Sequence, residues 1–222
     1  MKIGIVGAGS IGHALAVRFA AAGHEVMLSN SRGPETLAAV VAALGPNVRA
    51  GTVPEAARFG DVVAIAIPPR ALRDLPAGPF AGKIVIDVNN YYPEHNGPLA
   101  ELDGSDLSSS EALGSLLPGA RVVKAFNTLY FERLLRDSRP DLPAELRIAV
   151  PVAADDPDAA RTVAALVDQL GFTPVDAGSL AESHRQQPGT SLYEAYRQAR
   201  IAGATLTASQ LRALLDRSLT LR

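Results

Sequence analysis

The sequence predicts an α/β fold in which a doubly wound, mainly parallel sheet has the strand order 3-2-1-4-5-6, with one or two extra strands and a short helical tail after it. Three observations predict this fold. Short apolar runs alternate with segments whose apolar residues recur at helical spacing. A glycine-rich turn, GAGSIG, directly follows the first apolar run. The length of 222 residues fits one large α/β domain with a small appendage.

Several segments predict strands, because each is a short apolar run bounded by glycine, proline or charge. They are Lys2–Val6, Glu25–Ser29, Val48–Thr52, Asp61–Ile67, Lys83–Val88, Arg121–Phe126, Leu146–Val152 and Phe172–Val175. Helical spacing predicts helices over Ile11–Ala22, Pro34–Leu44 and Pro157–Leu170, and a helical tail over Leu192–Leu219. Strands joined through helices imply right-handed crossovers, so the sheet is expected to be covered on both faces.

Two segments have no clear period. Tyr91–Ser110 is rich in Gly, Pro, Ser and Asp, which predicts a surface loop near the functional site. A polar loop containing His184 follows Asp176-Ala177-Gly178.

The composition excludes several classes of function. The net charge is −2, so no global field attracts nucleic acid or an anionic membrane. No apolar stretch reaches membrane-spanning length without charge or proline. The chain has four scattered histidines and no cysteine, so we expect no metal site. We therefore expect a soluble cytoplasmic protein with neither nucleic-acid nor membrane partners.

The glycine turn has the context that dinucleotide binding requires. Gly7-Ala8-Gly9-Ser10-Ile11-Gly12 fits GxGxxG, follows a strand and opens a helix. Gly7 permits the tight turn, Gly9 lets backbone approach a pyrophosphate, and Gly12 lets the helix pack close to the strand. Free N–H groups of Ser10 and Ile11 at the helix start then face the phosphates. We predict a Rossmann-type nucleotide-binding domain over 1–150 and a strand-helix extension over 151–222. The alternative is a glycine-rich turn in an α/β domain that binds no nucleotide.

The end of the second strand indicates which nucleotide is bound. In this fold an Asp or Glu about 20 residues after the glycines hydrogen-bonds the ribose 2′-OH of NAD. Asn30 lies 18 residues after Gly12, and Ser31 and Arg32 follow it. The stretch has no repulsive carboxylate, and its hydroxyl and guanidinium are donors suited to a 2′-phosphate. We predict NADP(H) rather than NAD(H). Alternatively, or in addition, Ser31 caps the helix that starts near Pro34 and Arg32 is solvated.

Five motifs together resemble one family. MKIGIVGAGSIG, SNSRGPETL, AIAIP, VVKAFNTL and PVDAGSL are similar to the NADP oxidoreductases that depend on coenzyme F-420 (F420), an 8-hydroxy-5-deazaflavin. The N-terminal motifs are shared with pyrroline-5-carboxylate reductases and the STEAP metalloreductases. The short tail after PVDAGSL distinguishes the chain from pyrroline-5-carboxylate reductases and imine reductases, because those proteins carry a long helical dimerisation domain there.

The resemblance implies that NADP(H) lies across the strand ends and that a deazaflavin, as co-substrate, stacks on its nicotinamide in a shallow cleft. It also implies a homodimer. The resemblance implies that Gly9 to Gly12 contact the pyrophosphate and that Ser31 and Arg32 contact the 2′-phosphate. It implies that Ile67, Pro68 and Arg70 flank the adenosine side. The residues implied to line the nicotinamide are Val88, Asn89, Phe126, Asn127 and Thr128. The loop DVNNYYP departs from the archaeal members, and its Tyr91 and Tyr92 are expected to narrow the acceptor pocket.

Direct hydride transfer needs aligned rings and no dedicated acid or base, so we assign no catalytic residue. Lys124 and His184 are the weak candidates. Because a fully buried charge is unfavourable, we expect Lys124 to contact a ligand or a partner, or else to face an open rim. His184 either contacts the acceptor or is a solvated loop residue. We expect either Asn89 or Asn90 to contact the cofactor; the alternative is that they form an Asx turn. We expect Asn127 to contact the cofactor as well; the alternative is that it caps the next helix.

The residues leave three functions open. The first is hydride transfer between NADP(H) and a small-molecule acceptor of deazaflavin or flavin type. The second is NADPH-dependent reduction of imines or small carbonyl compounds, with Tyr91, Lys124 or His184 as the proton donor. The third is a non-catalytic NADPH-binding sensor.

Overall fold

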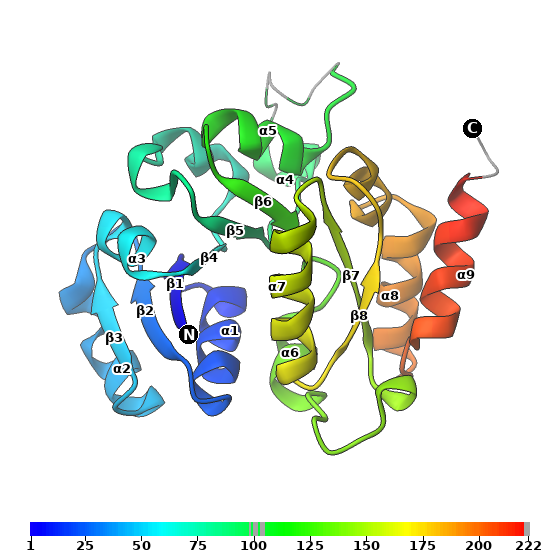
Figure 1. Ribbon diagram of the computed structural model, residues 1–222, viewed down its shortest axis with the longest axis horizontal. Coiled ribbons are helices and arrows are strands. Elements are labelled where there is room, and N and C mark those ends of the chain that lie inside the picture. Colours follow the sequence, from blue (N-terminus) through cyan, green and yellow to red (C-terminus); the bar gives the residue numbers. More distant parts are fainter. Residues whose placement is uncertain (98, 100–101, 103–104, 220–222) are drawn as a thin grey trace.

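The computed structural model describes residues 1–97, 99, 102 and 105–219, and shows one eight-stranded sheet of order β3-β2-β1-β4-β5-β6-β7-β8 (Figure 1). The strands are β1 (Lys2–Val6), β2 (Glu25–Ser29), β3 (Val48–Gly51), β4 (Val62–Ile65), β5 (Ile84–Asp87), β6 (Arg121–Lys124), β7 (Ala149–Ala154) and β8 (Thr173–Asp176). The α-helices are α1 (Ser10–Ala21), α2 (Ala38–Leu44), α3 (Val53–Phe59), α4 (Pro93–Asn96), α5 (Ser109–Leu116), α6 (Phe131–Arg136), α7 (Pro157–Gln169), α8 (Ser191–Ile201) and α9 (Ala208–Leu219). Short 3₁₀ helices lie at Pro34–Leu37, Pro69–Asp74, Gly78–Phe80, Ala144–Leu146 and Ala181–Gln186.

The order 3-2-1-4-5-6 and the mainly parallel sheet are confirmed. Strands β1 to β6 are all parallel, but β7 runs antiparallel to β6 and β8 runs parallel to β7. The carboxyl ends of β1 to β6 therefore share one edge of the sheet, and those of β7 and β8 point the other way.

Some predicted bounds were wrong. The predicted tail over 192–219 is two helices, α8 and α9, separated by a break. Leu146 lies in a 3₁₀ helix, and the strand expected from it begins at Ala149. The helix expected from Pro34 starts as a 3₁₀ turn over Pro34–Leu37 and becomes α-helical at Ala38. The helices α3 and α6 were not predicted, and α5 begins inside the expected loop Tyr91–Ser110.

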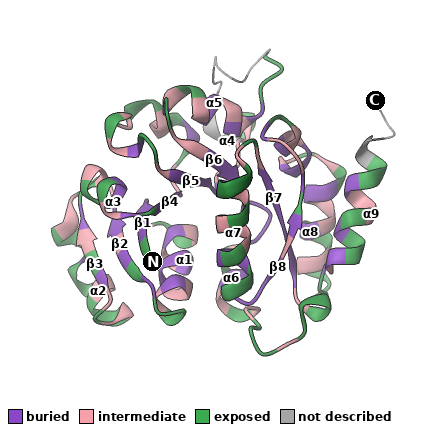
Figure 2. Ribbon diagram, in the orientation of Figure 1, coloured by how far each residue is buried: buried purple, intermediate pink, exposed green. Residues whose placement is uncertain are grey.

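The central strands are buried on both faces, which explains why they read as continuous apolar runs (Figure 2). In β5, Ile84 and Ile86 join a cluster with α1 and α7, whereas Val85 joins a second cluster with α3 and α5. The period of two thus places each side chain against one of two helical layers. Within the part of the chain that the structure describes, no helix is both long enough and apolar enough to span a membrane.

Polar side chains connect the N-terminal half of the sheet to the later helices. The Arg18 Nε–H of α1 donates to the carbonyl of Leu134 in α6 at 2.8 Å. His24 Nε2 lies 3.1 Å from Gln169 Oε1 at the end of α7. The two halves of the sheet are therefore joined by specific bonds as well as by the core.

Candidate functional site

The glycine turn after β1 has the geometry that its sequence predicts. Gly7 has φ +106°, a left-handed value that L side chains rarely adopt. A Cβ on Gly12 would lie 1.9 Å from the carbonyl oxygen of Gly7, so the close packing of α1 on the turn requires glycine. A Cβ on Gly9 would meet nothing within 4 Å. Gly9 therefore leaves open space in front of the start of α1, where a pyrophosphate would approach.

The loop after β2 is shaped by its own side chains. Ser29 is buried, and its hydroxyl donates to the carbonyl of Ile5 at 3.0 Å. Asn30 Oδ1 accepts the backbone N–H of Arg32 at 2.9 Å, and its Nδ2 donates to Thr36 Oγ1 at 2.9 Å. This Asx turn leaves Ser31 and Arg32 exposed. The capping alternative for Ser31 was wrong, because the N-cap of the next helix is Gly33 and no side chain caps it.

One groove joins the glycine turn to this loop and to the end of β4. It encloses about 1320 Å³ of space, part of it open to solvent. Seven predicted cofactor residues line it: Gly7, Gly9, Asn30, Ser31, Arg32, Ile67 and Pro68. The groove combines free backbone at a helix start with an exposed guanidinium, which are the donor types that a phosphorylated dinucleotide needs.

The turns that follow β5 and β6 are bonded to each other. Asn90 Nδ2 donates to the carbonyl of Asn127 at 2.8 Å, and Asn127 Nδ2 donates to Asn90 Oδ1 at 3.0 Å. Asn127 also donates to the carbonyl of Gln186 at 2.8 Å. Asn127 does not cap a helix, since the N-cap of α6 is Tyr130. These amides fix two strand ends at the edge where ligands bind in such sheets.

Lys124 lies in the core and forms an ion pair. Its side chain is fully buried, and its Nζ lies 3.0 Å from Asp87 Oδ2. The ammonium also donates to the carbonyl of Asn89 at 2.6 Å and to Ser109 Oγ at 3.4 Å. The expectation of an open rim was therefore wrong: Asp87, which the sequence analysis did not single out, neutralises the charge inside the protein.

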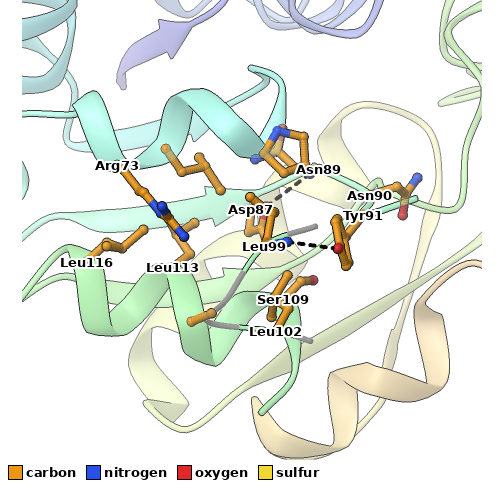
Figure 3. A pocket seen from close by; sticks show the side chains of 13 residues that line it. Arg73, Asp87, Asn89, Asn90, Tyr91, Leu99, Leu102, Ser109, Leu113 and Leu116 are labelled. Atoms are coloured by element: carbon orange, nitrogen blue, oxygen red, sulfur yellow. Dashed lines mark hydrogen bonds between the residues drawn. The ribbon is translucent and has the colours of Figure 1, made fainter. Parts of the chain in front are cut away.

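A second, smaller pocket lies between the turn after β5 and α5. It encloses about 430 Å³. Figure 3 shows Asn89, Asn90 and Tyr91 at one end of it, and Leu113 and Leu116 with Arg73 at the other. Asp87 and Ser109, both contacts of Lys124, also line it. The pocket thus has an apolar wall and a polar end that the Lys124 ion pair supports.

Two tyrosine hydroxyls meet beside this turn. The hydroxyls of Tyr92 and Tyr193 form a short hydrogen bond, and Asn90 Nδ2 lies 3.4 Å from that of Tyr193. Burial raises the pKa of Tyr193, and the bond to Tyr92 raises it further. Burial also raises the pKa of Tyr92 and outweighs the effect of Tyr193. Both groups are therefore neutral at physiological pH, and one of the two hydroxyls donates to the other. The sequence analysis missed this pair, since 101 residues separate its members.

The three proton donors proposed from sequence have other partners. The Tyr91 hydroxyl donates to the carbonyl of Gly97 and accepts from the N–H of Leu99, both at 3.2 Å. His184 Nδ1 lies 2.8 Å from the carbonyl of Ala181. Lys124 is buried in its ion pair. We therefore assign none of these three side chains as a proton donor to a ligand.

The remaining predicted cofactor residues lie outside the groove lining. Ser10, Ile11 and Gly12 form the first turn of α1 beside it. Arg70 is exposed in the 3₁₀ helix Pro69–Asp74. Val88, Phe126 and Thr128 are buried, and Asn89 lines the smaller pocket. Phe126 has φ +64°, and among the described residues every other residue with positive φ is a glycine. Parts of the loop Tyr91–Ser110 lie outside the described residues.

Comparison with known proteins shows what the chain resembles. Residues 2–91 match the family described as "NADP oxidoreductase coenzyme F420-dependent". The "F420-dependent NADP reductase" of Methanothermobacter thermautotrophicus is 29% identical over 199 residues, which cover 81% of this chain and 82% of that protein. "Metalloreductase STEAP3" of Rattus norvegicus is 32% identical over 185 residues, covering 82% of this chain. That match covers only 35% of STEAP3, so the chain corresponds to about a third of this curated relative.

The fold also matches solved structures. The crystal structure of a hypothetical protein, SMa0349, from Sinorhizobium meliloti superposes with a TM-score of 0.74 and is 37% identical. The superposition covers 86% of this chain and 91% of that one. The sheet and its appended helices are thus shared over nearly the whole of both chains.

Proposed function

Because the chain belongs to the family of coenzyme F420-dependent NADP oxidoreductases, we propose that it binds NADP(H) in the groove and exchanges hydride with a flat deazaflavin, F420, or a flavin-like ring. The observation that supports the cofactor is the exposed Ser31-Arg32 pair, which the Asx turn of Asn30 presents beside the open glycine turn. The acceptor is supported by the match to the archaeal reductase along both chains.

Each part of the groove has a separate role in this proposal. The open backbone at Gly9 and the first turn of α1 would hold the pyrophosphate. Arg32 would hold the 2′-phosphate, and Asn30 adds no negative charge to repel it. Ile67 and Pro68 would bound the groove on the adenosine side. When bound, the nicotinamide supplies the hydride chemistry, and the chain orients the ring and excludes water.

The test begins with cofactor binding. We expect NADPH to bind more tightly than NADH, and Arg32→Ala to weaken NADPH by about tenfold or more while leaving NADH unchanged, because it removes a charge-assisted hydrogen bond. Arg161→Ala removes an exposed arginine of α7 and should change neither affinity. Equal affinities for NADPH and NADH, or an Arg32→Ala variant that keeps its NADPH affinity, would overturn the cofactor assignment.

The acceptor is tested by turnover of the same protein. We expect NADPH oxidation with F420 or flavin in a panel that also contains quinones, imines and small carbonyl compounds. The neutral hydroxyl pair of Tyr92 and Tyr193 favours a second candidate, reduction of an imine or carbonyl compound. In that case turnover would need these substrates and would fall in Tyr92→Phe. Tight NADPH binding without turnover of any acceptor would support a sensor instead.

The proposal includes a homodimer, which the family resemblance supports, and a cytoplasmic location, which the absence of cysteine in the sequence favours. It also keeps the division near residue 150, with the C-terminal extension completing the acceptor cleft. The residues on both sides of that division share the eight-stranded sheet.

A further inference from the structure

The proposed hydride transfer makes no use of Lys124, although its contacts are unusually complete. An ammonium group has three N–H donors, and the side chain is buried among three acceptors, those of Asn89, Asp87 and Ser109. A group bonded in this way has no N–H left for a ligand. Its effect on the site must therefore pass through the residues that it holds.

The contacts of Lys124 and Asp87 converge on Asn89. Lys124 donates to the Asn89 carbonyl at 2.6 Å, and Asp87 Oδ1 accepts the Asn89 N–H at 3.0 Å. Both backbone groups of Asn89 thus have a charged partner, and charge-assisted hydrogen bonds are the stronger kind. Ser110 donates to Asp87 Oδ2 at 2.7 Å and holds the carboxylate from α5. The backbone of Asn89 is thereby fixed from two strands and a helix.

The side chain of Asn89 contrasts with its backbone. Its Nδ2 is buried and has no hydrogen-bond partner among the described residues. Asn89 lines the smaller pocket, at the polar end that Figure 3 shows. A buried donor without an acceptor is unfavourable, so this amide needs a partner that the described residues do not supply. A fixed backbone and an unpaired amide on a pocket wall are the features of a group prepared for a ligand.

We propose that Lys124 and Asp87 are positioning residues, which hold Asn89 so that its Nδ2 donates to a carbonyl oxygen on a ring bound at this end of the pocket. The proposal rests on the proposed function, since that carbonyl belongs either to the carboxamide of the nicotinamide or to the acceptor ring. A buried ion pair suits this role, because neither partner can move into water without leaving the other charge buried.

The test compares three variants with the wild type. Asn89→Ala removes the donor. The paired variant Lys124→Met with Asp87→Asn removes both charges together and so leaves no isolated buried charge. The third variant combines all three substitutions. For each variant we would measure kcat and KM with the acceptor that the panel described above identifies. We would also measure the NADPH dissociation constant, the fluorescence of bound NADPH and the exchange rate of the Asn89 backbone amide proton.

We expect Asn89→Ala and the paired variant each to lower kcat by about tenfold, the effect of one hydrogen bond. The NADPH affinity should also fall, by up to about tenfold, if the carbonyl belongs to the nicotinamide, and should stay unchanged if it belongs to the acceptor. The paired variant should also speed exchange of the Asn89 amide proton, and it should lower the fluorescence of bound NADPH if the carbonyl belongs to the nicotinamide. The combined variant should lose no more than Asn89→Ala, because the positioning residues act only through Asn89.

The matched control is Lys83→Met, because Lys83 directly precedes β5, the strand that ends at Asp87. Lys83 Nζ donates to the carbonyls of Arg58 and Gly60 at 3.1 and 2.8 Å, so the control also removes a carbonyl-bound lysine. It should leave kcat and fluorescence unchanged. Independent losses that multiply in the combined variant would overturn the proposal. If the paired variant does not fold, Asn89→Asp tests whether the side-chain donor is used, because it keeps the size of the side chain and removes the N–H donor. Unchanged kcat and unchanged fluorescence of bound NADPH in Asn89→Asp would overturn the proposal.

Two further arms separate the outcomes. With a thionicotinamide analogue of NADPH, the effect of Asn89→Ala should shrink if the carbonyl belongs to the cofactor and persist if it belongs to the acceptor. A wild type that binds no NADPH would overturn both the proposed function and this inference. A wild type that binds NADPH but reduces no acceptor would overturn the acceptor alone, and fluorescence and amide exchange would still decide the role of Lys124.

Discussion

At the scale of single residues, the glycines of the turn after β1 have separable roles. A Cβ on Gly12 would meet the Gly7 carbonyl oxygen at 1.9 Å, whereas one on Gly9 would meet nothing within 4 Å. Gly9 also has φ −73°, which any residue adopts. Gly12 is therefore needed for folding, and Gly9 is free to vary as far as the fold alone is concerned.

We predict that Gly9→Ala keeps the fold, at a cost below about 1 kcal/mol, and weakens NADPH binding by about tenfold or more, because its methyl group occupies the space that a pyrophosphate would enter. Gly12→Ala should instead destabilise the protein by about 1–3 kcal/mol or more through overpacking. Urea denaturation and NADPH titration of both variants check this. Unchanged NADPH affinity in a folded Gly9→Ala protein would contradict the position given to the pyrophosphate.

Sequence reasoning identified these glycines because their role depends on local backbone geometry, which a spacing rule captures. It also selected Asn30, whose Asx turn is local. It missed the partner of Lys124, since Asp87 lies on the neighbouring strand, 37 residues away. A buried lysine in an apolar strand indicates that an acid is near, but only the strand register, Asp87 opposite Lys124, identifies it.

At the scale of elements, the two short helices α3 and α5 begin with capping boxes. Thr52 and Glu55 cap α3 reciprocally, and Ser108 and Glu111 cap α5. Ser108 is buried, and its hydroxyl also donates to the Leu180 carbonyl at 2.9 Å. The cap of α5 therefore joins two segments of the chain, and α5 provides the serines that contact Lys124 and Asp87.

We predict that Ser108→Ala lowers the free energy of unfolding by about 2–3 kcal/mol, because it removes a cap and leaves the Leu180 carbonyl without its donor. The exposed Thr52→Ala should cost only about 1 kcal/mol. Chemical denaturation measures both, and Ser115→Ala on the exposed side of α5 is the control. Equal losses at Ser108 and Thr52 would show that the bond to Leu180 adds nothing.

The helix α3 shows why some elements escaped prediction. It spans only Val53–Phe59, which is too short for a hydrophobic period to stand out, and it contains Pro54. The signal that could have identified it is the T-x-x-E spacing of Thr52 and Glu55, with proline in the first turn. The same S-x-x-E spacing marks the start of α5 within a segment whose composition favoured a loop.

At the scale of the whole molecule, His24 connects the start of the sheet to α7. It is buried, packs edge-on against Phe19 and is bonded to Gln169. Burial lowers the pKa of His24 below its ordinary 6.5, the charge of the amino terminus lowers it further, and the bond to Gln169 acts in the opposite direction. Below pH 6.5 the unfolded chain therefore binds this proton more readily than the folded protein.

We predict that stability falls as the pH drops from 6.5 toward the lower pKa of folded His24, by at most about 1.4 kcal/mol per pH unit for one proton. In His24→Gln this part of the pH dependence should disappear. Urea unfolding at several pH values between about 7.5 and 5.5, roughly one unit either side of the ordinary value, measures it, with His13→Gln as the control. A His24→Gln protein whose stability falls as steeply as that of the wild type would refute this origin.

The overall topology was predictable up to β6, because parallel strands joined by helical crossovers allow few arrangements. The reversal at β7 was not, since β7 reads as apolar in either direction. The break between α8 and α9 lies at Ala202-Gly203, inside a segment whose apolar spacing continues to Leu206. Gly203 ends α8, because it adopts a left-handed φ of +63° and the N–H of Ala204 turns back to the carbonyl of Ala199. The Leu206 carbonyl then accepts the N–H of Ala149 and ties the connection to β7.

The left-handed conformation of Phe126 limits how this sequence can vary. Its backbone suits glycine, yet its ring is fully buried among the residues of the larger core cluster. Glycine would relieve the backbone and leave a void in the core, whereas a smaller or branched residue would keep the strain and lose contacts. Asn or Asp tolerates the backbone but would place a polar group in the core. A substitution of Phe126 is therefore tolerated only if the turn after β6 and the core around the ring change with it.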